Sequence, residues 1–294
     1  MKLAWLLLLA GCQDALDQRL AIVASPRMLA VASEPPEVMP GQAATLSALV
    51  AAPTGPLVAM PTWALCAAPK PPTEDNAVAD GCLADAVIQL GTSPIVTAPI
   101  PADACRTFGP DVADPGFRPR DADATGGYYQ PIRAEMRNLD PAFGFTRITC
   151  NLANAPGDVA QQYKTTYVAN ANPTLLPLAL DGVVLPTDGI TPAFVTADHD
   201  VTLVASWPAE ASESFLYYDP DSQRLITRHE TIKVSWFATA GALDVDASAV
   251  DETSTATSVT TNWHTPTAGP AWLWLVLRDS RGGVATATYA IVAR

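Results

Sequence analysis

This sequence of 294 residues contains only three histidines, His199, His229 and His264, and none of them lies in a known catalytic motif. Neither a Gly-x-Ser-x-Gly nor a His-Glu-x-x-His pattern occurs, so the usual serine and zinc hydrolase signatures are absent. His199 stands between two aspartates at the start of a predicted strand, where a solvated turn explains it. We therefore expect a protein that is not an enzyme and that carries no cofactor.

Basic residues and long hydrophobic runs are also scarce. The chain has 17 Lys and Arg against 30 Asp and Glu, a net charge of −13. Because binding of phosphate groups requires a basic patch, we expect no nucleic acid among its partners. The run Leu3 to Ala10 is much shorter than the roughly 20 apolar residues that a membrane-spanning helix needs, and no later run reaches that length.

The N-terminus has the pattern of an export signal. Lys2 precedes the short apolar run, which ends in small residues, as in signal peptides. Leu9-Ala10-Gly11-Cys12 resembles the lipobox of bacterial lipoproteins, in which the chain is cut before the cysteine and a diacylglycerol is attached to its sulfur. The resemblance implies a signal peptide at 1–11, lipidation at Cys12, a tether at 12–19 and a membrane as partner. An ordinary secretory signal is the alternative.

Gln13 follows that cysteine. In lipoproteins of Gram-negative bacteria, Asp at this place usually accompanies retention in the inner membrane. The resemblance therefore implies a location at the outer membrane or cell surface.

The composition favours an all-β fold. Proline occurs 27 times, which disfavours helices, and apolar residues alternate with polar ones at Val201 to Trp207 and Ile232 to Ala238. Such short alternating segments are typical of β-sandwiches. The length exceeds that of a usual single domain, so we predict two sandwich domains, residues 20–172 and 173–294.

The first half resembles bacterial immunoglobulin-like (Ig-like) domains. Residues 27–53 alternate, kink at two prolines, turn at Pro40-Gly41 and alternate again, and Trp63 takes the place of the core tryptophan. Residues 67–120 show little alternation, so we predict a long disulfide-restrained insertion rather than regular sheet. Further strands are expected within 126–136, 145–152 and 164–171.

The second half resembles bacterial Ig-like and PKD-like modules. The matching features are a strand that ends at Trp236, a turn at Gly241, the segment Trp263 to Pro266, and a hairpin tip from Asp279 to Gly283. In that tip, glycine suits a positive φ, and Asp279 is expected to accept hydrogen bonds from backbone N–H groups. With the lipobox, this order of features resembles uncharacterised outer-envelope lipoproteins of myxobacterial type, which implies no known activity.

Four cysteines follow the lipobox cysteine. An even number in an exported chain predicts two disulfides, and zinc is disfavoured because no close Cys-x₂-Cys spacing occurs. Of the three possible connectivities, alternation favours Cys66 with Cys82 and Cys105 with Cys150, since Cys66 and Cys150 lie on faces that point apart.

Two acidic segments raise the question of calcium. Asp121 to Gly126 has the opening pattern of a calcium loop, but Ile132 stands where the closing Glu is needed. Local turns explain Asp121 and Asp123 equally well. A second group, Asp244, Asp246, Asp251 and Glu252, fits a cation or plain solvation, and we expect no metal at either.

Trp272 and Trp274 are the candidate binding residues. Alternation places Leu273, Leu275 and Leu277 toward the core, and therefore both tryptophans on the opposite face. An exposed aromatic pair suits a sugar ring or a protein partner, whereas the other domain or a loop covering this face is the alternative. We expect a lipid-anchored binding or structural module of the cell envelope. The rival hypothesis is a glycan-active enzyme or accessory subunit with an acidic cleft.

Overall fold

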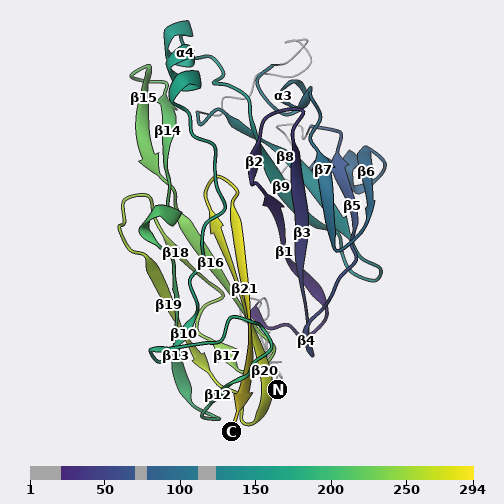
Figure 1. Cartoon of the computed structure of the whole chain (residues 1–294), viewed down its shortest axis with the longest axis vertical. Coiled ribbons are helices and arrows are strands. Elements are labelled where there is room, and N and C mark those ends of the chain that lie inside the picture. The colour runs from purple at the N-terminus through teal and green to yellow at the C-terminus, as the bar shows by residue number, and fades with distance from the viewer. Residues whose placement is uncertain (1–20, 70–77, 112–123) are drawn as a thin grey trace, which may run out of the picture.

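A computed structural model describes residues 21–69, 78–111 and 124–294, and shows an all-β chain folded into two Ig-like β-sandwiches that lie side by side (Figure 1). Cys12, Asp121 and Asp123 lie outside the described residues. Of the helices in the described ranges, α4 (Gly157–Thr166) is the longest, and none is long and apolar enough to cross a membrane.

The first sandwich packs two sheets face to face. One sheet has the order β1-β3-β4, with β7 paired to β3, and the other has the order β2-β9-β8-β5-β6. The bounds are β1 (Arg27–Glu34), β2 (Glu37–Val38), β3 (Ala43–Ala52), β4 (Gly55–Pro56), β5 (Thr62–Cys66), β6 (Val87–Thr92), β7 (Ile95–Pro99), β8 (Gly127–Glu135) and β9 (Ala142–Thr149).

The core of this sandwich lies between those sheets. Leu46 of β3 faces Leu65, Ile132 and Ile148 of the other sheet, and all four are fully buried. Trp63 is also buried, and its indole N–H donates to the carbonyl of Ser93 at 2.8 Å, which satisfies the polar atom that burial would otherwise leave unpaired. Trp63 is thus a core tryptophan, as its place in the sequence predicted.

Two disulfides restrain the first sandwich, Cys66 with Cys82 and Cys105 with Cys150, which is the connectivity favoured from the sequence. Cys82 and Cys105 lie on the short helices α2 (Asp80–Leu83) and α3 (Ala104–Thr107). The described part of the insertion also contains β6 and β7, which extend both sheets of the sandwich. The prediction that regular sheet is lacking there was therefore wrong, because β6 and β7 alternate too weakly to be recognised.

A second correction concerns the segment after β9. The predicted strand at 164–171 is instead the end of α4 followed by extended chain. Its Val, Thr and Tyr content suggested a strand, but the segment pairs with no sheet. It lies against the ends of both sandwiches instead.

The second sandwich packs two five-stranded sheets, ordered β12-β21-β20-β16-β18 and β11-β10-β13-β19-β17. The bounds are β10 (Ala179–Leu180), β11 (Val183–Val184), β12 (Ala193–Val195), β13 (Asp200–Ser206), β16 (Ile232–Ala238), β17 (Ala242–Leu243), β18 (Ala247–Val250), β19 (Ser258–His264), β20 (Gly269–Asp279) and β21 (Val284–Ala293).

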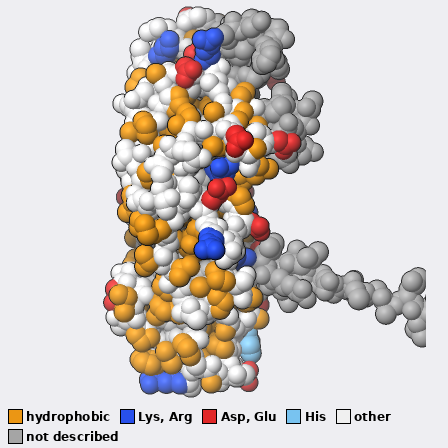
Figure 2. Space-filling view, turned by 90° about the vertical axis from the view of Figure 1, so that its right-hand side faces the viewer, with side chains coloured by type: hydrophobic (Ala, Val, Ile, Leu, Met, Phe, Trp, Pro, Cys, Tyr) orange, Lys and Arg blue, Asp and Glu red, His pale blue; other side chains and the backbone are white. Residues whose placement is uncertain are grey.

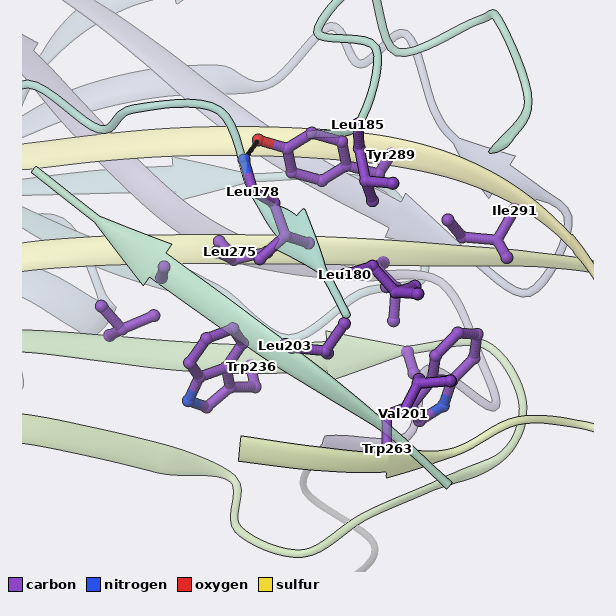
Figure 3. Packing of buried hydrophobic residues seen from close by; sticks show 14 of the residues in the cluster. Leu178, Leu180, Leu185, Val201, Leu203, Trp236, Trp263, Leu275, Tyr289 and Ile291 are labelled. Carbon is purple, nitrogen blue, oxygen red and sulfur yellow. Dashed lines mark hydrogen bonds between the residues drawn. The ribbon is translucent and has the colours of Figure 1, made fainter. Parts of the chain in front are cut away.

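Its core is built around two tryptophans from opposite sheets. Trp236 of β16 and Trp263 of β19 are buried among Leu203, Leu275 and other aliphatic side chains (Figure 3). The Trp263 indole donates to the carbonyl of Ala240 at 3.1 Å. Figure 3 also shows the Tyr289 hydroxyl accepting from the backbone N–H of Leu178, at 2.9 Å.

A hairpin and the chain start tie the two sandwiches together. The hairpin β14 (Ser214–Asp219) and β15 (Arg224–His229) rises from the second sandwich beside α4 of the first (Figure 1). The described chain begins on the second sandwich, where Val23 N–H donates to the carbonyl of Ala238 at 2.8 Å, and only then enters β1. On the face in Figure 2, acidic and basic side chains are interspersed along the length of the molecule.

Candidate functional site

Trp272 and Trp274 lie on the face of β20 opposite the leucine row, but they do not form an exposed platform. Trp274 is 0% exposed and packs with Leu29, Ala30 and Ala51 of the first sandwich. The turn at Gly55 approaches so closely that a Cβ there would lie 2.6 Å from the Trp272 ring. The predicted binding surface was wrong because this sheet face is covered by β1 and β3, which the local sequence around Trp272 does not reveal.

These contacts form an apolar seam between the sandwiches, made by Val23, Leu29, Ala30, Ala51, Trp274 and Val276. Trp272 and Trp274 stack at the seam with ring centroids 6.5 Å apart. Among the described residues, the buried Trp274 indole nitrogen has no hydrogen-bond partner. The seam is therefore held by packing of apolar surface rather than by polar contacts of these rings.

Above the seam, a buried ion pair lies on the first sandwich. Arg147 Nε is 3.2 Å from Glu37 Oε2, and the two side chains are 1% and 0% exposed. Gly127 leaves the room that Arg147 needs, since a Cβ there would overlap its guanidinium. Glu37 also accepts hydrogen bonds from the Tyr167 hydroxyl and the Asn170 backbone N–H, so its carboxylate is fully engaged.

A second buried network lies on the facing end of the second sandwich. Arg281, at the tip of the β20–β21 hairpin, donates to Glu230 at 2.7 Å and to Glu213 at 2.9 Å. Asp279 accepts from the backbone N–H groups of Arg281 and Gly283, both at 2.8 Å, as the hairpin motif predicted. Gly282 takes a φ of 104° in that turn.

Burial raises the pKa values of three acidic groups at this junction. It raises the pKa of Glu230 to about 7, with the nearby Asp279 adding to the shift and Arg281 opposing it. Burial likewise raises the pKa of Asp279, and raises that of Tyr167 to about 12. Perturbed acids of this kind occur in functional sites and in structural ion-pair networks alike, and every one of these three groups is hydrogen-bonded within the junction.

The chain that connects the sandwiches runs between the two networks. Asn170 bonds Glu37 through its backbone, and its side-chain amide lies 3.4 Å from both oxygens of Asp279. Asn172 donates to the carbonyl of Ser33 and accepts from the N–H of Val284, both at 2.8 Å. The connection is thus bonded to both sandwiches along its length.

A cleft of about 270 Å³ opens between this junction and the β14–β15 hairpin. Its lining comes from both sandwiches: Thr125, Tyr129, Arg147, Phe215, Tyr217, Arg228, His229, Thr231, Glu252, Ser280 and Arg281. The Arg228 guanidinium lies 3.7 Å from the centre of the Tyr217 ring, which is a cation–π contact. Arg147 and Arg281 are each paired with a buried carboxylate, at 3.2 Å and 2.7 Å. Arg228 differs from them because it reaches only the exposed Glu252, at 3.9 Å.

His264 occupies a separate polar cluster on the second sandwich. Its ring nitrogens lie 2.7 Å from Asp200 and 3.2 Å from Asp198, and these hydrogen bonds raise its pKa. His199 stands between these aspartates in the sequence, but cross-strand pairing of Asp200 with His264 brings the more distant histidine to them. The cluster is exposed to solvent.

The acidic group at 244–252 is divided among different partners. Asp244 accepts from Asn262, Asp251 closes a turn with Thr253, and Glu252 faces Arg228. Within the described residues, no set of three or more His, Cys, Asp or Glu side chains is arranged to hold a metal ion.

The buried groups Glu37, Arg147, Glu230 and Arg281 were not identified from the sequence. A signal was present in β9, where Arg147 alternates with the core residue Ile148 and so belongs to the outer sheet face. That signal indicates which face the arginine occupies, and the partner that covers it becomes visible only in the folded chain.

No protein-family model and no curated protein matches the chain. Similar solved structures include fibronectin(III)-like modules of Clostridium thermocellum CbhA, at 10% identity and a TM-score of 0.26 over 90% of this chain and 94% of that chain. The D00-D0 domain of intimin aligns at 10% identity and a TM-score of 0.26, over 92% and 98% of the two chains. The Yersinia pseudotuberculosis adhesin InvE aligns at 10% and 0.21, over 90% and 58%. Likenesses this distant add nothing to the choice of function.

Proposed function

We propose that this chain is a lipid-anchored surface protein of the bacterial outer envelope, a non-enzymatic binding or structural module held by Cys12. In this proposal, residues 20–172 and 173–294 are its two domains and residues 12–19 its tether. Its partners are the membrane, through the lipid, and an envelope protein or glycan.

The observation that carries the proposal is the pair of disulfides in the first sandwich, taken with the lipobox. Disulfides persist in oxidising compartments and are rare in the cytosol. Cys66–Cys82 and Cys105–Cys150 therefore support export, and the lipobox supports attachment after export. Two acyl chains on one cysteine hold a protein firmly at a membrane, at about 0.8 kcal/mol per buried CH₂.

The junction supports a structural or binding role. An apolar seam, two buried ion-pair networks and a bonded connection hold the sandwiches in one arrangement. The carboxylates of Glu37, Glu213 and Glu230 are held by Arg147 and Arg281, rather than facing each other across an open groove as a pair of catalytic acids would. A rigid body of this kind presents its surface loops in fixed positions.

The test is metabolic labelling of cells with a fatty-acid analogue. Wild-type protein is expected to incorporate the label and to fractionate with the envelope. Cys12→Ser is expected to incorporate none, because the thioether requires the sulfur. Cys66→Ser in the same cells is the matched control and should keep the label. Label in Cys12→Ser, or none in wild type, would remove the lipoprotein assignment.

A further inference from the structure

A second cavity of about 320 Å³ lies beside the junction cleft at the base of the hairpin, and His229 and Glu252 line both. We refer to these two neighbouring cavities together as the groove. Its second part is lined by Trp207, Ala209, Ser212 and residues 252–257, a segment rich in serine and threonine. Both cavities are open to solvent, and their lining combines apolar surface with hydroxyl, guanidinium and carboxylate groups.

Arg228 is held ready for a ligand in this groove. In the hairpin register, Phe215 pairs with Arg228 and Tyr217 with Ile226, which places Phe215, Tyr217 and Arg228 on one face. The Tyr217 ring supports the guanidinium plane. Among the described residues, the only acid in contact with Arg228 is Glu252, at 3.9 Å, and both side chains are more than a third exposed. Because this ion pair of the guanidinium is long and exposed, the guanidinium can bind a second anion.

The remaining lining suits a polyhydroxyl compound. Thr231, Ser280 and the Ser/Thr segment at 253–257 supply groups that both donate and accept hydrogen bonds. The rings of Phe215 and Tyr217 lie next to the guanidinium groups of Arg281 and Arg228, at 5.3 Å and 3.7 Å, so they hold these arginines rather than offering an open stacking surface.

We infer that this groove binds a carboxylate-bearing saccharide, with the carboxylate held by Arg228 and the sugar hydroxyls by the Ser and Thr side chains. A planar carboxylate matches the fork of an arginine in two parallel hydrogen bonds. The ligand carboxylate replaces Glu252, whose contact at 3.9 Å is too long for a good hydrogen bond. The inference rests on the proposed binding function and names its site and ligand class.

Substitutions at Glu252 and at Arg228 should change the affinity for the ligand in opposite directions. Removing the Arg228 charge takes away the group that binds the carboxylate. Neutralising Glu252 takes away the competing anion and leaves Arg228 in place. A variant that merely disturbs the hairpin would weaken binding in both cases, so the pair of variants separates binding from structure.

The experiment is calorimetric titration of the full mature protein, purified in detergent, with tetragalacturonate at about 0.15 M salt, where charges are screened beyond about 8 Å. We expect saturable binding that Arg228→Gln weakens by about tenfold or more, as loss of a charge-assisted pair does. Glu252→Gln should strengthen it by about two- to fivefold, the size of an exposed ion pair. Arg224→Gln, on the same hairpin face but outside the groove, should bind as wild type.

Four results would overturn the inference. These are no binding of tetragalacturonate by the wild type, equal binding of its methyl ester, an unchanged affinity in Arg228→Gln, and a preference for a peptide carboxylate over the saccharide. Each leaves the lipid anchor untouched, because the fatty-acid labelling of Cys12 is independent of the groove. Failure of labelling, in turn, would leave the saccharide measurement standing.

Discussion

Arg281 Nε and Glu230 Oε1 lie 2.7 Å apart where the second sandwich meets the first, with side chains 3% and 0% exposed. The pair is buried together with Asp279, and the same arginine reaches Glu213 and the carbonyl of Val168. One cation therefore balances several acidic groups that have little water around them. Its removal would leave those acids uncompensated.

The first prediction is that Arg281→Leu strongly destabilises the protein. Breaking a buried pair by removing one partner costs about 3–5 kcal/mol of unfolding free energy. The measurement is urea unfolding at neutral pH, with the exposed Arg224→Leu as control. A loss below about 1 kcal/mol, similar to that of the control, would mean that the junction does not depend on this pair.

The second prediction concerns pH. Glu230 has an ordinary pKa of 4.5 and a folded value of about 7, so between these values the folded state binds a proton that the unfolded state releases. The free energy of unfolding then falls as the pH rises through this window, is greatest below it, and levels off above it. Asp279 and His264, whose pKa values are also raised, act in the same direction.

Glu230→Gln isolates the contribution of this one group. The amide keeps a hydrogen-bond acceptor for Arg281 but cannot titrate, so stability should depend less on pH between about 5 and 7 than in the wild type. Thermal melting across that range is the measurement. Parallel curves for the two proteins would show that Glu230 titrates in its ordinary range.

The third prediction separates the ring of Trp274 from its polar atom. Trp274→Ala empties a fully buried position and should cost about 3–5 kcal/mol, as large-to-small core substitutions do. Trp274→Phe keeps most of the ring, and the nitrogen that it removes has no partner among the described residues, so it should cost less than about 1.5 kcal/mol. Urea unfolding of both variants compares them. Equal losses would contradict the view that the apolar ring, rather than its nitrogen, is what Trp274 contributes to the seam.

The fourth prediction ranks the two disulfides. Cys105–Cys150 spans 45 residues and Cys66–Cys82 spans 16, and a longer closed loop restricts the unfolded chain more. Replacing the 105–150 pair by alanines should therefore cost about 1 kcal/mol more than replacing the 66–82 pair. Both double variants are compared by urea unfolding under non-reducing conditions. The reverse order would show that local strain or packing outweighs chain entropy.

Local patterns were sufficient for much of the fold. Alternation located β13 and β16, cysteine spacing and facing favoured both disulfides, and the Asp279 hairpin followed from a short motif. Each of these depends on residues close together in the sequence or on one strand's own periodicity. Weakly alternating strands such as β6, which contains Gly91, escaped recognition because most of their side chains are exposed or half-buried.

The site depended on contacts between distant residues. Which face of β20 carries Trp274 could be deduced from alternation, but its cover comes from residues more than two hundred positions earlier. Arg281 stands in a hairpin tip, where an arginine is ordinarily solvated, and its burial arises from docking against the other sandwich. Arg228 meets Glu252 from a different loop in the same way.

The first described residues are attached to the second sandwich, although β1, which follows them, belongs to the first. Residues 21–23 lie against the end of β16, so a pull on the chain ahead of Ala21 acts first on the second sandwich. The sheet that contains β16 also forms the seam with β1, and the chain passes into β1 after residue 26. If the proposed anchor and groove are both correct, tension between them would pass through the second sandwich before it reached the first.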